Sequence, residues 1–334
     1  MQHQIKLLVV LKVLGGLVIG IFVVYAAWQT ITNGKTPGEF TAFITAFLMA
    51  YEPAKKVSKY WVELQKSLVQ TGNLYEILDA ENVLSEKGII KNLDPSSDLQ
   101  FSDVSFAYNG SKSALTNISF SIKAGEFVAV IGKSGSGKST LIDLIMRFYD
   151  PVKGNISLGG HEIRDISRHE LKQFIALITQ DVFLFDGTIR ENIHDGNPSA
   201  SVEQIMQAIK FASLDKLIAD LPKGVETDVG ANGANLSGGQ KQRIGIARAG
   251  VKDAKLFIFD EATSALDADN ERRVLCNLSQ IKGRATILFV THRPAALEYV
   301  DRVLFLEEGS ISGFGTYTEL LESNEKFRLL MNGS

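Results

Sequence analysis

The stretch GKSGSGKST at residues 132–140 matches the phosphate-loop pattern G-x-x-x-x-G-K-[ST]. An apolar run precedes it and an amphipathic run follows it, so we expect a strand, a loop and a helix rather than a chance glycine-rich turn. Glycines let backbone N–H groups point at phosphate oxygens, and the N-terminus of the helix adds partial positive charge. Lys138 is predicted to pair with the β- and γ-phosphates, and the Ser139 hydroxyl is predicted to ligate Mg²⁺. The residues of this loop predicted to bind ATP are Gly132, Lys133, Ser134, Gly135, Ser136, Gly137, Lys138, Ser139 and Thr140.

Two adjacent carboxylates, Asp260 and Glu261, end a second apolar run in the stretch KLFIFDEATSALD. An unpaired buried charge is costly, so acids at the end of a buried strand indicate a bound cation or chemistry there. We predict that Asp260 ligates Mg²⁺, directly or through water. Glu261 is predicted to orient and deprotonate the attacking water. Strand ends often carry acids, and it is the combination with the phosphate loop that makes this pattern specific.

Three further side chains complete the predicted site. Gln180 ends the apolar run in LITQD and is predicted to reach both the metal and the water. His292 ends the run in ATILFVTHR and is predicted to contact the γ-phosphate and Glu261. Tyr108, in FAYNG upstream of the phosphate loop, is predicted to stack on an adenine ring. Each has a structural alternative, because a lone histidine or a strand tyrosine more often serves packing.

A second glycine-rich run, LSGGQ at residues 236–240, precedes an amphipathic run. Ser237 offers a hydroxyl, Gly238 and Gly239 expose backbone N–H groups, and the following helix directs its positive end at an anion. A simple N-cap by Ser237 is the alternative, although a cap alone requires neither two glycines nor a glutamine. Because a phosphate loop is already present, we expect LSGGQ to contact phosphate from another side.

The order of these motifs resembles that of the ATP-binding-cassette (ABC) family, and the resemblance covers residues 99 to about 331. The stretch DVFLFDGTIRENI after Gln180 is typical of its exporter-type members. The resemblance implies that LSGGQ of one subunit closes over the ATP bound by a second subunit, with a homodimer as the expected assembly. Ser237 and Gly239 would then contact the γ-phosphate held by that second subunit. The implied interface residues are Leu236, Ser237, Gly238, Gly239 and Gln240 in the signature loop, and Ser264, Ala265, Leu266 and Asp267 in a loop that crosses the interface, the D-loop.

Hydropathy divides the chain of 334 residues into unequal parts. Apolar residues are concentrated near the N-terminus, where helices are predicted at about residues 7–31 and 38–79. A signal peptide is the alternative for the first run, which is longer than such peptides usually are and lacks a cleavage site. Together the two helices form a predicted partial transmembrane domain over residues 1–80. A linker over residues 81–98 and an α/β domain over residues 99–334 are predicted to follow.

The membrane part also resembles ABC exporters, because TPGEFTAFITAFLMAYEPAKKV is similar to their last transmembrane helix. The similarity is to the branch of lipid A flippases and multidrug exporters, in which residues 1–80 would be the last two of six helices. Lys55, Lys56 and Lys59 predict a cytoplasmic exit, hence a multi-pass protein of the inner or plasma membrane with a cytoplasmic ATPase domain. The implied fold class is a P-loop NTPase with a parallel-sheet core, an antiparallel β subdomain and an α-helical subdomain, preceded by a partial all-α transmembrane domain.

The expected function is ATP binding and hydrolysis, with ATP and Mg²⁺, coupled to export of a lipid or hydrophobic small molecule. Expected partners are a second ABC subunit and membrane lipid. The net charge of −3 and the sequence pI near 6.0 do not favour nucleic acid. One alternative is a truncated ABC ATPase remnant that does not transport. Another is a soluble ABC ATPase of DNA repair or chromosome structure, although such proteins separate their motifs by long coiled coils.

Four questions stay open at the level of the sequence. They are the transported substrate, whether the chain is a piece of a six-helix half-transporter, whether it transports alone, and whether it forms a homodimer or a heterodimer. Cysteine adds little, because the single Cys276 excludes an internal disulfide and fits a small apolar helix position.

Overall fold

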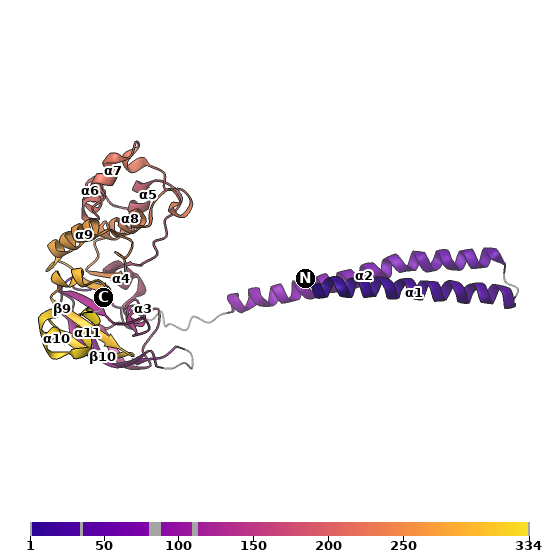
Figure 1. The fold of residues 1–334 in the computed structure, drawn as a ribbon, viewed down its shortest axis with the longest axis horizontal. Coiled ribbons are helices and arrows are strands. Elements are labelled where there is room, and N and C mark those ends of the chain that lie inside the picture. The colour runs from indigo at the N-terminus through magenta and orange to yellow at the C-terminus, as the bar shows by residue number, and fades with distance from the viewer. Residues whose placement is uncertain (1, 34–35, 80–87, 109–112, 333–334) are drawn as a thin grey trace. The chain divides into compact units, whose positions relative to one another are not determined.

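The computed structural model describes residues 2–33, 36–79, 88–108 and 113–332. The chain forms two compact units, Met1–Asn82 and Val83–Ser334. The first is a pair of helices, and the second contains all the described strands (Figure 1). The predicted linker over residues 81–98 falls partly on residues 80–87, which lie outside the described residues. Beyond them, Ile90 pairs with Ile166 and Leu93 is buried, so this end of the predicted linker packs on the second unit.

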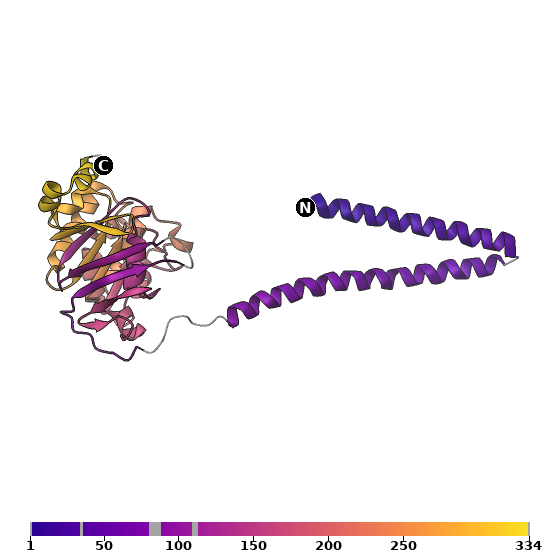
Figure 2. The ribbon, with the colours of Figure 1, turned by 90° about the horizontal axis from the view of Figure 1, so that it is seen from below.

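The first unit is an antiparallel helical hairpin (Figures 1 and 2). Helix α1 spans Gln2–Asn33 and helix α2 spans Pro37–Leu78. Near the turn the ring of Phe22 stacks on those of Phe43 and Phe47, with centroids 6.1 and 5.3 Å apart. These contacts hold the hairpin together where both helices are apolar.

One stretch of the described residues, Gly15–Thr32 in α1, is long and apolar enough to cross a membrane, with a mean hydropathy of 1.6. Its large apolar side chains are exposed, Leu17 at 59% and Ile21 at 63%, as expected for a surface that faces lipid or other apolar helices. Pro53 lies inside α2, which continues past it to Leu78.

Two sheets form the framework of the second unit (Figure 2). The first is antiparallel, with the strand order β2-β1-β4-β5, and the second has the order β10-β9-β3-β8-β7-β6. In the second sheet all neighbouring strands are parallel except β10, which runs antiparallel to β9. The strands are β1 (Leu99–Phe106), β2 (Leu115–Ile122), β3 (Phe127–Ile131), β4 (Lys153–Leu158), β5 (His161–Glu162), β6 (Ile175–Ile178), β7 (Leu256–Asp260), β8 (Thr286–Val290), β9 (Arg302–Glu307) and β10 (Ser310–Gly315).

Helices cover the second sheet, and α5 to α8 gather in the upper part of the unit in Figure 1. The helices are α3 (Lys138–Ile145), α4 (Arg168–Phe174), α5 (Ile189–His194), α6 (Val202–Phe211), α7 (Asp215–Asp220), α8 (Gly238–Gly250), α9 (Ala268–Ile281), α10 (Tyr317–Ser323) and α11 (Glu325–Asn332). Short 3-10 helices occur at Gly224–Glu226, Ala231–Gly233 and Pro294–Glu298.

The parallel sheet is buried on both faces, which explains why its strands read as unbroken apolar runs. Along β3, Phe127 joins the cluster formed with the helices α5 to α9, and its neighbour Val128 joins the cluster shared with the antiparallel sheet and α3. A third cluster joins β3 and β9 to α10 and α11. A parallel-sheet core with an antiparallel β subdomain and a helical subdomain confirms the predicted fold class.

We expect the aromatic centre of this sheet to carry much of the stability of the second unit. Phe289 is fully buried, and its ring lies 6.1 Å from that of Phe127 and 5.5 Å from that of Phe259. Phe289→Ala should lower the free energy of unfolding by about 3–5 kcal/mol, because it removes this burial and leaves a cavity. The matched control is Val202→Ala at a side chain that is 67% exposed. Scanning calorimetry of the purified full chain measures both, and equal transition temperatures for the two variants would contradict the assignment.

Candidate active site

The phosphate loop lies between β3 and α3, and its glycines are required by its geometry. Gly137 has φ = +104°, and a Cβ there would lie 2.6 Å from Leu115 Cδ2. A Cβ on Gly132 would lie 2.4 Å from the carbonyl oxygen of Leu306. Any side chain at these two positions would therefore force the loop apart.

Lys138 occupies the first turn of α3 and bends back over the loop. Its Nζ donates hydrogen bonds to the carbonyl oxygens of Gly132 at 2.7 Å and Lys133 at 3.1 Å, and the residue is only 7% exposed. Burial lowers the pKa of this ammonium, while the carboxylates of Glu261 and Asp260 oppose that shift. The loop thus holds one positive charge at its centre, opposite two acids.

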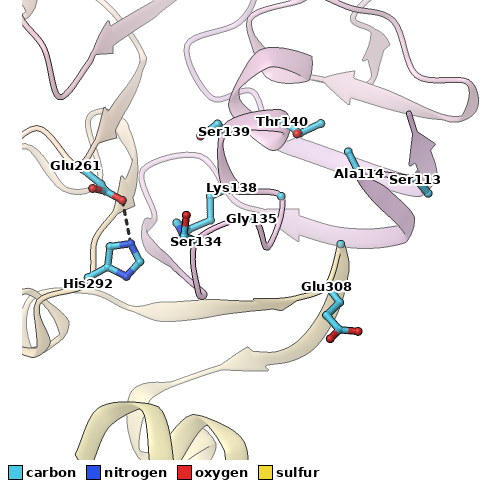
Figure 3. A pocket seen from close by; sticks show the side chains of 12 residues that line it. Ser113, Ala114, Ser134, Gly135, Lys138, Ser139, Thr140, Glu261, His292 and Glu308 are labelled. Carbon is cyan, nitrogen blue, oxygen red and sulfur yellow. Dashed lines mark ion pairs between the residues drawn. The ribbon is translucent and has the colours of Figure 1, made fainter. Parts of the chain in front are cut away.

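Glu261 and His292 meet across the cleft from the phosphate loop (Figure 3). Glu261 follows β7, His292 follows the neighbouring strand β8, and His292 Nε2 lies 2.9 Å from Glu261 Oε1. The backbone of Glu261 adopts φ = +50°, a conformation that is costly for a residue with a side chain. Its N–H donates to the carbonyl oxygen of Val290 at 3.1 Å, which fixes the strained residue against β8. The predicted contact between these two side chains is therefore present.

The cleft between these groups has a volume of about 540 Å³. Figure 3 shows the phosphate loop at its centre, the pair of Glu261 and His292 on one side, and Ser113 and Ala114 on the other. Its lining residues are Ser113, Ala114, Ser134, Gly135, Gly137, Lys138, Ser139, Thr140, Glu261, His292, Glu308 and Gly309. Of these, Ser113, Ala114, Glu308 and Gly309 were not predicted. The only signal for the last two is the turn-like EEGS, which does not reveal that the turn approaches the phosphate loop.

The loop fits the phosphates of a nucleotide. Gly135 has φ = +78° and no atom within 4 Å of the position of a Cβ, so its backbone is open toward the cleft. The Ser136 hydroxyl is buried and has no hydrogen-bond partner among the described residues. A glycine-rich segment of this kind, with a central ammonium, suits a polyanion.

The predicted metal ligands all lie at or beyond the carboxyl ends of the parallel strands, but not all of them line the cleft. Ser139 lines the cleft, whereas Gln180 and Asp260 are not among its lining residues. Gln180 follows β6 by two residues, and Asp260 ends the adjacent strand β7. Burial and then the Glu261 charge raise the pKa of the Asp260 carboxyl, and Lys138 opposes this. A bound cation would relieve that repulsion.

No group of three or more His, Cys, Asp or Glu side chains forms a metal cluster within the part of the chain that the structure describes. Mg²⁺ in nucleotide sites is commonly held by only one or two carboxylates and completes its shell with phosphate, water and neutral oxygens. The hydroxyl of Ser139 and the carboxylate of Asp260 fit that requirement.

The hydroxyl of Tyr108 anchors this side chain to α3. That hydroxyl donates to Asp143 Oδ2 at 2.8 Å and lies 3.2 Å from Thr140 Oγ1, both on α3. Its ring meets Phe106 and Tyr149 edge-on, at 4.9 and 5.1 Å. Burial is the main cause of the raised pKa of this phenol. Tyr108 does not line the cleft, so adenine stacking stays a prediction while the packing role is present in the structure.

The signature loop lies in a different pocket of the same unit. Ser237 caps α8, since its Oγ accepts from the Gln240 N–H at 3.3 Å and its own N–H donates to Gln240 Oε1 at 2.8 Å. This pocket of about 440 Å³ has no lining residue in common with the phosphate cleft. Its lining residues are Ser237, Gly238, Gly239, Gln240, Arg243, Ala265, Leu266, Asp267 and Asn270. The chain therefore separates its two candidate phosphate-contacting loops, and Leu236 of the signature packs against the helical cluster instead.

Two polar side chains that were not predicted hold the D-loop. Gln242 on α8 donates to Ser264 Oγ at 3.2 Å and accepts from the Ala265 N–H at 3.0 Å. Arg293 donates to the carbonyl oxygens of Ser264 and Leu266, at 2.8 and 3.2 Å. Neither residue belongs to a recognisable motif, and only their neighbourhood in LSGGQKQR and THR would have drawn attention to them.

A phosphate loop between a parallel strand and its helix, with an acid pair at the end of a nearby parallel strand, defines a P-loop nucleotide-binding domain. Residues 115–264 match the family model described as ABC transporter. The chain belongs to the ABC transporter family, which confirms the resemblance noted in the sequence.

Known proteins are similar to this chain along almost its whole length. An uncharacterized ABC transporter ATP-binding protein of Sinorhizobium fredii is 37% identical over 322 residues, 96% of this chain and 55% of that protein. The ATP-dependent lipid A-core flippase of Desulfotalea psychrophila is 38% identical over 323 residues, 96% of this chain and 56% of that protein. A solved bacterial Atm1-family ABC exporter with ATP bound matches with a TM-score of 0.74 and 29% identity, over 98% of this chain and 58% of that one. The chain thus spans about half the length of the curated relatives it matches.

The packing of the signature loop predicts opposite effects at its two glycines. A Cβ on Gly239 would lie 2.8 Å from the backbone oxygen of Ala265, whereas a Cβ on Gly238 meets only the Ala265 Cβ at 3.5 Å. Gly239→Ala should lower the free energy of unfolding by about 1–3 kcal/mol through overpacking. Gly238→Ala should leave it unchanged or raise it by up to about 1 kcal/mol, because alanine favours helices. Scanning calorimetry of the full chain compares the two, and a stable Gly239→Ala variant would contradict the close approach.

Proposed function

We propose that this chain is the ATP-hydrolysing part of a membrane exporter half that works as a dimer. The observation that carries the proposal is the Glu261–His292 pair facing the phosphate loop across one cleft. A base, a residue that orients it and a phosphate cradle are the components that hydrolysis of a nucleotide requires.

The proposed chemistry assigns each side chain one task. The phosphate loop and Lys138 hold the β- and γ-phosphates and stabilise the charge that develops on them. Glu261 accepts the proton of the attacking water at its carboxylate. His292 holds that carboxylate through Nε2 and contacts the γ-phosphate. Tyr108 is proposed to support the adenine.

Mg²⁺ is proposed to be held by Ser139, Gln180 and Asp260. Bound there, it would neutralise charge on the phosphate oxygens. The half-buried Asp260, whose carboxylate is destabilised by burial and by Glu261, supports this assignment. Gln180 lies in the loop after β6, at the carboxyl end of the strand adjacent to that of Asp260.

The separation of the two pockets supports a composite site. Within one chain, the pocket lined by residues 237–240 of LSGGQ and the phosphate cleft have no lining residue in common. We therefore propose that Ser237 and Gly239 contact ATP bound by a second subunit, and that the D-loop, Ser264–Asp267, crosses the same interface. A homodimer satisfies this arrangement, because each chain supplies both halves.

The rest of the proposal concerns the membrane. Residues 1–80 are proposed as a partial transmembrane domain in the inner or plasma membrane. Residues 81–98 are proposed as a linker, and residues 99–334 as an ATPase domain in the cytoplasm. Relatives named ATP-dependent lipid A-core flippase support a lipid or other hydrophobic substrate. A chromosome-type ATPase is disfavoured, since the longest helix described in the second unit, α9, has 14 residues and is too short for a long coiled coil. ATP-driven lipid movement by the reconstituted chain would exclude a non-transporting remnant.

Glu261→Gln should abolish turnover and retain ATP binding. The amide keeps the shape and a hydrogen bond to His292 but cannot accept the proton of water at neutral pH. A loss in kcat of about 10²-fold or more is expected for removal of a general base. Phosphate release measures turnover, and calorimetry measures binding of ATP. The matched control is Glu298→Gln, at an exposed acid outside the cleft; hydrolysis by Glu261→Gln at the wild-type rate would remove it as the base.

A mixture of two inactive variants tests the composite site. Ser237→Arg blocks the signature loop, and Lys138→Ala disables the phosphate loop, so each homodimer should be inactive. A mixed dimer contains one intact pair of loops, and statistical mixing should recover about a quarter of wild-type hydrolysis. A mixture no more active than its components would contradict assembly across the interface.

A further inference from the structure

Gln242 connects three segments that the proposed site uses separately. It lies on α8, in the second turn of the helix that begins with the signature loop, and is only 3% exposed. Its Nε2 donates to the carbonyl oxygen of Gln180 at 3.1 Å and to Ser264 Oγ at 3.2 Å. Its Oε1 accepts from the Ala265 N–H at 3.0 Å.

These three bonds use nearly all the hydrogen-bonding capacity of the amide, and no other side chain can make all three. A buried amide that loses its partners costs free energy, so the three segments and Gln242 favour one mutual arrangement. Gly239 adds a steric constraint, because it packs so closely on the Ala265 carbonyl that a Cβ would not fit. The first two turns of α8, which include Gly239 of the signature loop, are therefore in contact with residues 264–265 at two points.

The neighbours of Gln242 distinguish it from an ordinary buried polar residue. Asn192 is a buried amide of the same unit, 1% exposed, and bonds to Phe185, Thr188 and Arg248 within the helical part. None of these partners lines the phosphate cleft or the signature pocket. Gln242, in contrast, bonds to a proposed metal ligand and to the D-loop.

We propose that Gln242 is a positioning residue that couples the two halves of the ATPase site within one chain. It fixes the position of the signature loop, which faces the ATP of the second subunit, relative to Gln180 and the D-loop of its own subunit. Nucleotide bound at one cleft is thereby communicated to the loop that completes the other. This inference rests on the proposed dimeric ATPase and adds a residue to it.

The experiment compares Gln242→Met, Gln242→Glu and Asn192→Leu in the purified full chain. Methionine preserves shape and removes all three bonds. Glutamate still accepts from the Ala265 N–H and the Ser264 hydroxyl but places a carboxylate against the Gln180 carbonyl oxygen. We expect Gln242→Met to lower kcat by about tenfold or more, with the Kd of a non-hydrolysable ATP analogue changed by less than about threefold. Gln242→Glu should lower kcat at least as much, because the buried carboxylate loses the bond to Gln180 and is repelled by its carbonyl oxygen.

Hydrogen exchange supplies a readout that does not depend on activity. The Ala265 amide should exchange faster in Gln242→Met and at the wild-type rate in Gln242→Glu. Asn192→Leu should lower thermal stability without changing kcat or Ala265 exchange. A wild-type kcat in Gln242→Met, or an equal loss of kcat in Asn192→Leu at equal loss of stability, would overturn the proposal.

The failure of the proposed function is separable from this result. A wild-type chain without ATP hydrolysis would remove the ATPase assignment and the coupling with it, whereas an active Glu261→Gln variant would remove only Glu261 as the base. An active wild type, an inactive Glu261→Gln and a fully active Gln242→Met would remove Gln242 alone. A double variant with Ser264→Ala locates the effect, because the two losses should be less than additive if Gln242 acts through Ser264.

Discussion

The common register of β3, β8 and β7 is the constraint on which the candidate site depends. Val290 at the end of β8 lies opposite Val130 of β3 on one side and Asp260 of β7 on the other. All three strands therefore end at one level, and the chain then leaves the sheet as the phosphate loop, the acid pair and the segment with His292. A slip of one residue would move Glu261 by about 3.3 Å and turn its side chain to the opposite face.

Burial on both faces is what fixes that register. Alternate residues of β3 and β8 enter different clusters, and the rings of Phe127, Phe259 and Phe289 interlock on one face. Polar residues are excluded from these strands and are concentrated at the strand ends, where the loops begin. The strained backbone of Glu261 is tolerated because its N–H is bonded to Val290 of the adjacent strand. The rigid sheet thus maintains a local conformation that the residue alone would not adopt.

The residue types and their spacing predict the fold class and the main loops, since those signals are local. Pairing between distant segments is not visible in the same way. Gly309 donates to the Ser136 carbonyl and accepts from the Thr116 N–H, which brings the β9–β10 turn to the phosphate loop. Nothing near residue 309 in the sequence indicates that partner. The same holds for Gln242, since a glutamine in a helix is ordinarily exposed, and its burial follows only from how the D-loop folds over α8.

The D-loop is also where the two pockets of one chain are connected. His292, in the phosphate cleft, is the covalent neighbour of Arg293, which bonds to D-loop carbonyls and to the buried Glu271 at 2.6 Å. From the opposite side, Gln242 holds the same loop against the signature helix. If His292 and Arg293 move together, residues 264–266 must move with them, or the hydrogen bonds from Arg293 to the carbonyl oxygens of Ser264 and Leu266 break. The connection between the two pockets passes through short polar contacts to the backbone, and for that reason it does not depend on the identity of most D-loop side chains.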